Sequence, residues 1–111
     1  MHKNKSALEL LKPFVRATFE NGTQLDLLEI MHADSDCPWT VEKLSASLCE
    51  KDQVIQHALM HLESRGLLKQ IGHQEFCFHP NTALSGALVN LLILQLKSRR
   101  LQIVRLIYDD N

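Results

Sequence analysis

Cysteine is scarce in this chain, and its spacing fits neither a disulfide framework nor a structural zinc site. The sequence contains three cysteines, Cys37, Cys49 and Cys77, without a CxxC pair. An odd number argues against a full set of disulfides, and finger-like metal sites need closely spaced ligand pairs. We therefore expect no metal ion and no disulfide, with Cys37 and Cys49 as buried or half-buried thiols and Cys77 on the surface of a strand.

Motifs of catalysis are also lacking. The chain has no glycine-rich phosphate loop, no nucleophile elbow and no HExxH. A domain of this size offers no deep cleft in which the pKa of a carboxyl or thiol group would be strongly perturbed. We expect neither enzymatic activity nor a cofactor.

No segment resembles a signal peptide, because Met1–Asn4 is not followed at once by a long apolar stretch. Apolar residues make up 45% of the chain, an ordinary fraction for a globular protein. A chain of 111 residues fits one small core and would gain from a partner. We expect a folded protein in the cytoplasm.

Two short helices and a hairpin are predicted between residues 40 and 80. Thr40 is a typical N-cap, and the apolar residues that follow share one helical face within each helix. These residues are Val41, Leu44 and Leu48 in the first helix, and Ile55, Leu59 and Leu62 in the second. Two amphipathic helices joined by three or four residues pack crosswise to bury such faces.

Gly66 is placed to end the second helix in a left-handed conformation and to lead into a strand over residues 67–71. Residues 72–75 form a turn, and the next strand alternates Phe76 and Phe78 inward with Cys77 and His79 outward. A short first strand is expected at Trp39, after an extended Cys-Pro dipeptide.

This segment resembles the winged helix-turn-helix of bacterial transcription regulators of the MarR and ArsR kind. The resemblance is carried by Ile55, Leu59, Leu62, Glu63, Gly66, Leu67 and Leu68. With a preceding helix over residues 24–33, it covers residues 24–80. It implies a mainly α fold with a small β-hairpin, and a DNA-binding module between an N-terminal helical extension (1–23) and a C-terminal dimerisation helix (81–111).

The N-terminal extension is predicted to hold a helix over residues 6–19. Pro13 lies in its middle and is expected to kink the helix or to make it begin again near Lys12. Asn21-Gly22 is expected to close it.

The C-terminal segment is apolar on every face from Ala83 to Leu96, so it must be buried on two sides. Fourteen residues form only about 21 Å of helix, too short for a bilayer, and Lys97 stops the run. We therefore expect no membrane span and a homodimer. The predicted interface comprises Leu84, Leu88, Leu91, Leu92, Leu96, Ile103 and Leu106.

The charge of residues 40–79 does not clearly favour DNA binding. Residues 40–79 contain four Lys or Arg and five Asp or Glu, and the hairpin lacks the arginine that related hairpins insert into a minor groove. Phosphate neutralisation supplies much of the affinity of DNA-binding proteins. If the module reads double-stranded DNA, the residues placed to do so are Lys51, Gln53, Gln56, His57, Lys69, His73 and Gln74.

Two alternatives remain open from the sequence. In the first alternative, the module has lost nucleic-acid binding and contacts a protein partner through its polar helix. In the second alternative, the module responds to a metal ion. His57 and His61 lie at positions i and i+4 of a helix, and Cys77 and His79 lie on one face of a strand. The histidines also predict that DNA affinity strengthens as pH falls from about 7.5 to 6, since an imidazole in water gains its proton near pH 6.5.

Overall fold

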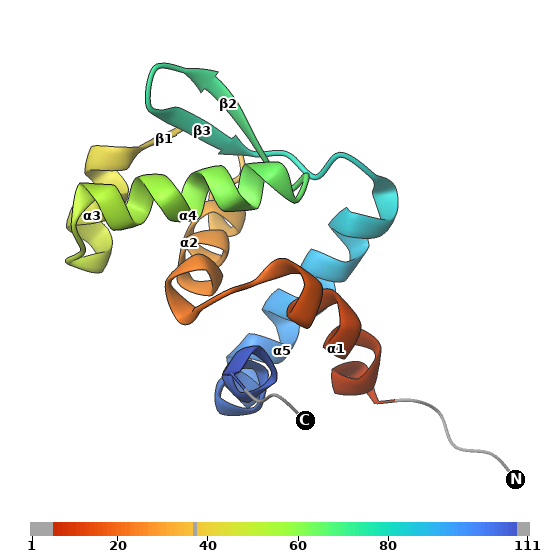
Figure 1. Cartoon of the computed structure of the whole chain (residues 1–111). Coiled ribbons are helices and arrows are strands. Elements are labelled where there is room, and N and C mark those ends of the chain that lie inside the picture. The colour runs from red at the N-terminus through yellow and green to blue at the C-terminus, as the bar shows by residue number, and fades with distance from the viewer. Residues whose placement is uncertain (1–5, 37, 109–111) are drawn as a thin grey trace, which may run out of the picture.

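Five helices and a small antiparallel sheet make up the described part of the chain, residues 6–36 and 38–108, in a computed structural model (Figure 1). The elements are α1 (Ala7–Thr18), α2 (Gly22–Ala33), β1 (Trp39–Thr40), α3 (Val41–Leu48), α4 (Asp52–Ser64), β2 (Leu68–Gly72), β3 (Glu75–Phe78) and α5 (Ala83–Tyr108). The predicted mainly α fold with a small β-hairpin is confirmed at this level. Cys37 lies outside the described residues.

Helix α1 begins at a capping box, in which Ser6 Oγ accepts from the Glu9 amide and Glu9 Oε1 accepts from the Ser6 amide, both at 3.2 Å. The helix then runs through Pro13 to Thr18, so the predicted new start near Lys12 is wrong. Pro13 and Glu9 are both exposed, and water can therefore satisfy the Glu9 carbonyl that the proline leaves without a donor.

The Asn21-Gly22 pair begins a helix and does not close one, which corrects the prediction. Helix α1 ends at Phe19, and Asn21 is the N-cap of α2, with its Oδ1 accepting from the Gln24 amide at 3.1 Å. Asparagine is as favourable at an N-cap as at a turn, so the dipeptide alone does not distinguish the two.

The three strands are ordered β1-β3-β2, all antiparallel, so that β3 is the central strand. Phe76 is fully buried on the side of the sheet that faces α2, as its alternation with Cys77 predicts. The hairpin turn is tied to the start of α3, because the Val41 amide donates to the Gln74 carbonyl at 3.2 Å. Gln74 adopts a left-handed φ of 59° there.

The crosswise pair α3 and α4 follows the predicted boundaries. Thr40 Oγ1 caps α3 by accepting from the Lys43 amide at 3.1 Å. Cys49 ends α3 in a left-handed conformation and is exposed, so the prediction of a buried thiol at this position is wrong.

Gly66 ends the α4 segment with a φ of 79°, as predicted, and the next amide, that of Leu67, donates to the Leu62 carbonyl at 3.1 Å.

A Cβ at Gly66 would lie 2.6 Å from Asn81 Nδ2. Gly66→Ala is therefore expected to lower the free energy of unfolding by about 1–3 kcal/mol in urea denaturation. The matched control is Gly86→Ala, in α5, where the Cβ meets nothing closer than 3.7 Å. The control should leave stability unchanged or raise it by up to about 1 kcal/mol, and equal losses in the two variants would contradict this account.

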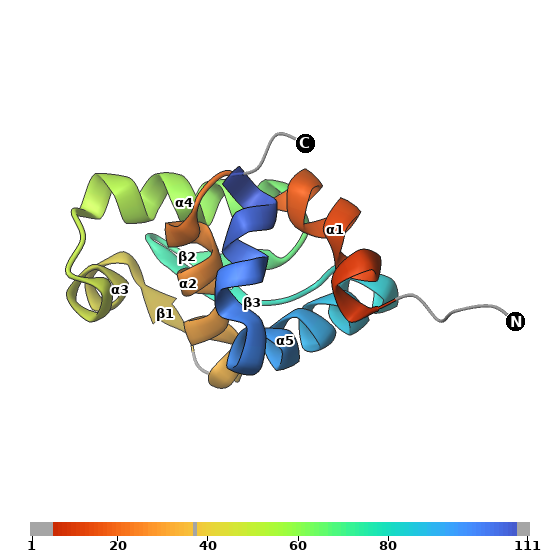
Figure 2. The same cartoon turned by 90° about the horizontal axis from the view of Figure 1, so that it is seen from below.

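Helices α1 and α5 pack together beneath the sheet-bearing part of the molecule, and α5 changes direction at Arg99, whose φ is −136° (Figure 2). Two contacts join the second half of α5 to α2. Arg100 pairs with Asp26 and Glu29, and the Tyr108 hydroxyl accepts from the Gly22 amide at 2.7 Å.

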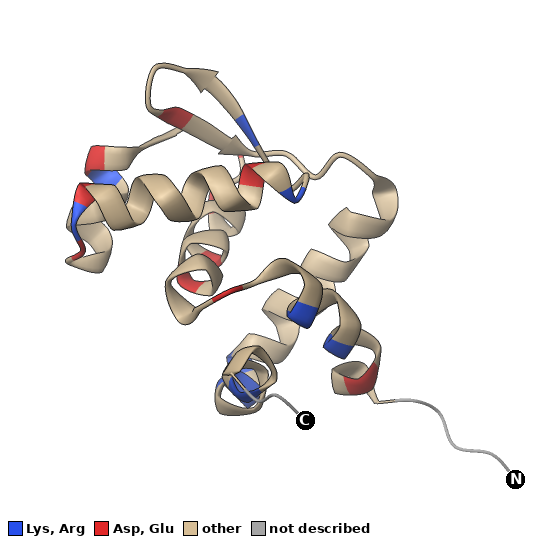
Figure 3. Ribbon diagram, in the orientation of Figure 1, with Lys and Arg blue, Asp and Glu red and all other residues tan. Residues whose placement is uncertain are grey.

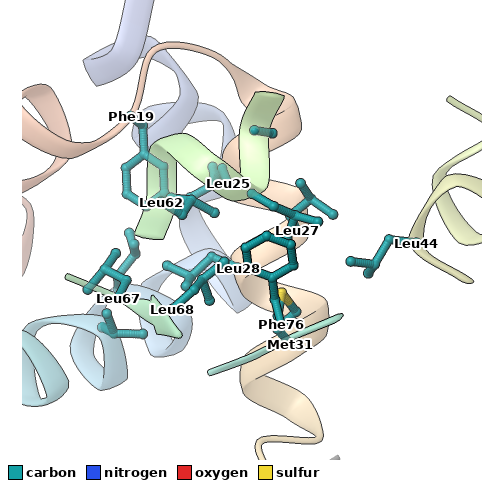
Figure 4. Close-up of a cluster of buried hydrophobic side chains, with 14 of the residues drawn as sticks. Phe19, Leu25, Leu27, Leu28, Met31, Leu44, Leu62, Leu67, Leu68 and Phe76 are labelled. Atoms are coloured by element: carbon teal, nitrogen blue, oxygen red, sulfur yellow. The ribbon is translucent and has the colours of Figure 1, made fainter. Parts of the chain in front are cut away.

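One hydrophobic core runs through all of the helices and the hairpin, and Figure 4 shows the part of it that α2, α4 and the sheet enclose. Leu92, Leu96 and Ile103 of α5 belong to this core within a single chain. Their prediction as dimer-interface residues is therefore corrected, because they present no surface to a second subunit.

Candidate nucleic-acid interface

The outer surface of α4 is hollowed where the helix faces the hairpin turn and the start of α3. The hollow has a volume of about 430 Å³. It is lined by Val41, Asp52, Gln53, Gln56, His57, Met60 and Gln74. Four of the residues predicted to contact DNA are thus brought together here, three from α4 and one from the hairpin turn.

These four side chains differ in how freely they reach the surface. Gln53 and Gln74 are exposed, and the His57 side chain is 75% exposed. Gln56 is half-buried, and its Oε1 has no hydrogen-bond partner among the described residues. Gln56 therefore lies in the floor of the hollow and does not project from it, which corrects its prediction as an outward residue.

The other three predicted DNA contacts lie at the edges of this surface. Lys51 is exposed at the N-cap position of α4, Lys69 is exposed on β2, and His73 is exposed in the hairpin turn. None of the three lines the hollow. Their positions suit contacts with the flanks of a bound molecule more than with its centre.

A second hollow, of about 250 Å³, lies on the other side of α4, against the start of α2. It is lined by Asn21, Thr23, Gln53, Val54, His57 and Ala58. Gln53 and His57 line both hollows, so they form a ridge between them. No sequence signal identifies Asn21 and Thr23 as part of this surface, because only the packing of α2 against α4 brings them there.

Glu20, in the turn between α1 and α2, is the other residue that the sequence did not reveal. Its Oε1 lies 3.7 Å from His57 Nε2 and 3.7 Å from His61 Nδ1, and it accepts from Gln24 Nε2 at 3.1 Å. The hydrogen bond from Gln24, and then the charge of His61, lower the pKa of Glu20 below its ordinary value. Glu20 is therefore a carboxylate at neutral pH beside the candidate interface.

The prediction that His61 faces outward is wrong. Its side chain is 12% exposed, and its Nε2 lies 2.7 Å from the Thr18 carbonyl oxygen. Within the described residues, no three His, Cys, Asp or Glu side chains are grouped so that they could hold a metal ion. Cys77 is half-buried and His79 is exposed, at the far end of the sheet from the ridge.

Charge is divided between two parts of the molecule (Figure 3). The acidic residues are spread over α2, α3, α4 and β3, and described residues 19–82 contain ten Asp or Glu and four Lys or Arg. Helices α1 and α5 together contain one acidic residue, Glu9, and six basic ones. The six are Lys12, Arg16, Lys97, Arg99, Arg100 and Arg105. The surface around α4 is thus the acidic part of the chain.

Exposed leucines line one face of α5, and this face includes Leu84 and Leu91 of the predicted interface. Leu84, Leu94 and Leu101 are 69%, 59% and 63% exposed. With the half-buried Leu91 they are spaced seven, three and seven residues apart, which places them along one side of a helix. Leu88 and Leu106 are half-buried and pack against the core of the same chain.

No helix in the described ranges combines the length and the apolar character needed to cross a bilayer. No protein-family model matches the chain, and no curated protein or solved structure is significantly similar to it.

Proposed function

We propose that residues 24–80 are a winged helix-turn-helix that binds double-stranded DNA, and that the chain acts as a homodimeric transcriptional regulator in the cytoplasm. The observation that carries the proposal is the exposed ridge of Gln53 and His57 on α4, beside the hairpin turn. The order α2, β1, α3, α4, β2, β3 and the sheet order β1-β3-β2 suit such a module. We propose no enzymatic activity.

Helix α4 would enter the major groove with its N-terminal half, the part of a recognition helix that meets base edges. A glutamine amide can bond N6 and N7 of adenine together, which gives Gln53 a means of selecting a base. Lys51 and Lys69 lie on the flanks, where phosphates would pass. With two such lysines per chain, a dimer would neutralise few phosphates and show a shallow salt dependence, with a slope of roughly −4.

Gln53→Ala and His57→Ala are each expected to weaken binding to a selected duplex by about 1–3 kcal/mol, and to relax selectivity at one base pair. Lys51→Ala or Lys69→Ala should weaken binding to all sequences alike and reduce the salt slope by about 1 for each phosphate that is no longer neutralised. The measurement is selection from a random duplex library at low salt, followed by binding isotherms. Lys12→Ala, on α1, is the control for the loss of one positive charge away from α4. A library that enriches no sequence would contradict DNA recognition.

A protein partner is the second candidate, and the excess of acidic residues over residues 19–82 is the observation that favours it. The hollow beside α4 offers Met60, which is 52% exposed, to an apolar side chain. A partner of this kind would carry basic residues around an apolar anchor. Binding that survives in high salt and needs Met60 would favour this candidate over DNA.

We assign the dimer interface to the exposed stripe of α5, comprising Leu84, Leu91, Leu94 and Leu101. The predicted homodimer thus keeps Leu84 and Leu91 of its predicted interface and gains the exposed Leu94 and Leu101. Burying such leucines against a second copy removes apolar surface from water at about 25 cal/mol per Å². Because α5 bends at Arg99, each half of the stripe would meet the partner separately.

A further inference from the structure

We propose that Glu20, His57 and His61 form a proton-dependent latch that fastens α4 to the turn between α1 and α2. When His57 is paired with Glu20, it is not free to contact a bound nucleic acid. The latch regulates the ridge on α4, and its effect on DNA rests on the proposed function. Its effect on folding does not, so the two can be tested separately.

The hydrogen bond of His61 determines where its second proton goes. A carbonyl oxygen only accepts, so the 2.7 Å contact with Thr18 requires that His61 Nε2 carries a hydrogen. In the neutral ring, Nδ1 then holds a lone pair, which faces the Glu20 carboxylate at 3.7 Å. Protonation places an N–H and a positive charge at this position. The contact therefore changes from unfavourable to attractive when His61 gains a proton.

Glu20 is held in place to receive that charge. The buried Gln24 side chain donates to Glu20 Oε1 at 3.1 Å and accepts from the Glu20 amide at 2.7 Å. His57 Nε2 approaches the same oxygen at 3.7 Å from the exposed side. One carboxylate oxygen thus lies between two imidazoles one helical turn apart on α4.

Within residues 6–36 and 38–108, Glu20 is the acidic side chain that pairs with His57 and His61. On α2, Asp26 pairs with Arg100 of α5. From α1, Arg16 lies one turn before the Glu20 turn, and from α5, the Tyr108 hydroxyl bonds the Gly22 amide. Protonation of either histidine therefore changes the charge that faces Glu20.

The sign of the pH effect follows from the two kinds of group. A histidine is positively charged only when it is protonated, so the attraction of His57 and His61 to Glu20 is present in acid and is lost as pH rises. The pKa of Glu20 is lowered from 4.5, so its contribution to stability is present above that value and is lost as pH falls through the depressed pKa. The latch is strongest in mildly acidic solution, where Glu20 is ionised and the two histidines are protonated.

The test is a double-mutant cycle between Glu20→Gln and His61→Gln, read by urea unfolding at about pH 5.5 and about pH 8. The cycle cancels the loss of the Thr18 hydrogen bond, which both His61 variants share. At the lower pH, we expect the effect of the double substitution on the folding equilibrium constant to differ by roughly two- to five-fold from the product of the two single effects. At the higher pH, we expect the two effects to be additive in free energy.

Glu42→Gln is the matched control, because it removes one exposed negative charge from α3, away from the latch. Its cycle with His61→Gln should be additive at both pH values. A Glu20–His61 coupling that is equal at both pH values, or absent at both, overturns the latch.

The regulatory part is tested on the duplex selected for the unmodified protein, at about pH 6. His57→Gln should weaken binding more in the Glu20→Gln background than in the unmodified chain, by roughly two- to five-fold, because Glu20 no longer engages His57. Equal effects in the two backgrounds overturn the regulation of His57. If no duplex binds, the proposed function fails, and the unfolding cycle still decides the latch.

Discussion

Leu92→Glu is expected to destabilise the folded chain strongly and not merely to separate a dimer. Leu92 is fully buried in α5, within the core of a single chain. A carboxylate at this position would be buried without a partner, which destabilises a protein by about 3–5 kcal/mol. Since a small domain is stable by only about 5–15 kcal/mol in total, a large part of its stability would be lost. Far-UV circular dichroism and urea unfolding measure the effect, and Leu96→Glu should behave in the same way.

Leu94→Glu is the matched variant, two residues further along α5 and 59% exposed. A charge there remains in water in the isolated chain, so the helical content and the unfolding midpoint should stay close to those of the unmodified protein. If a second copy covers this leucine, the substitution leaves a charge at a desolvated interface and sedimentation should show a folded monomer. An unmodified protein that sediments as a monomer at all concentrations would refute the homodimer, whatever the variants do.

The contrast between these two leucines shows why the sequence could not place the dimer interface. From Ala83 to Leu96 nearly every residue is apolar, so the 3.6-residue periodicity that identifies a buried face is missing. Hydrophobicity alone could not distinguish Leu92, which packs inside the chain, from Leu94, which lies outside. The bend at Arg99 adds to the difficulty, because a seam drawn through a straight helix does not follow the surface of a bent one.

Where the periodicity was clear, the sequence predicted the structure well. Val41 and Leu44 face inward in α3, Ile55, Leu59 and Leu62 do so in α4, and the alternation around Phe76 gives the strand register. The new helix start near Lys12 and the closing role of Asn21 were wrong for a shared reason. Each residue type suits more than one position in or near a helix, and the packing of neighbouring elements decides among them.

The candidate site was predictable only where it lies on one element. The outward face of α4 identified Gln53 and His57, which line both hollows. Glu20 could not be connected with His61, forty-one residues away, because the contact depends on how α1, α2 and α4 pack together. For the same reason the burial of the Gln56 side chain could not be inferred from its position in the helix.

Phe76→Ala is expected to lower the free energy of unfolding by about 3–5 kcal/mol, the usual loss when a buried phenyl ring is removed. Phe76 is fully buried and lies on the central strand, opposite Trp39 on β1 and Gln70 on β2. Figure 4 places its ring among the core side chains beside Met31 of α2. No neighbouring strand can close the cavity without breaking the sheet, so little of the loss should be recovered by relaxation.

Phe78→Ala is the matched control, since the same ring is removed from the same strand. Phe78 is half-buried and meets the His32 ring edge-on at a centroid distance of 5.3 Å. Its removal should lower the free energy of unfolding by about 1–2 kcal/mol, from partial burial and one aromatic contact. Equal losses for the two variants would contradict the central position of Phe76.

The Phe76 variant should also separate the sheet from α3. The hairpin turn is joined to α3 by the hydrogen bond from the Val41 amide to the Gln74 carbonyl, and Gln74 reaches that position through β3. Loosening β3 should therefore increase hydrogen exchange at the Val41 amide and in β1 and β2 before it does so in α1 and α5, which pack against each other away from the sheet. Val41 and Gln74 both line the hollow beside α4. Phe76→Ala should therefore weaken the binding of any ligand in that hollow more than Phe78→Ala does.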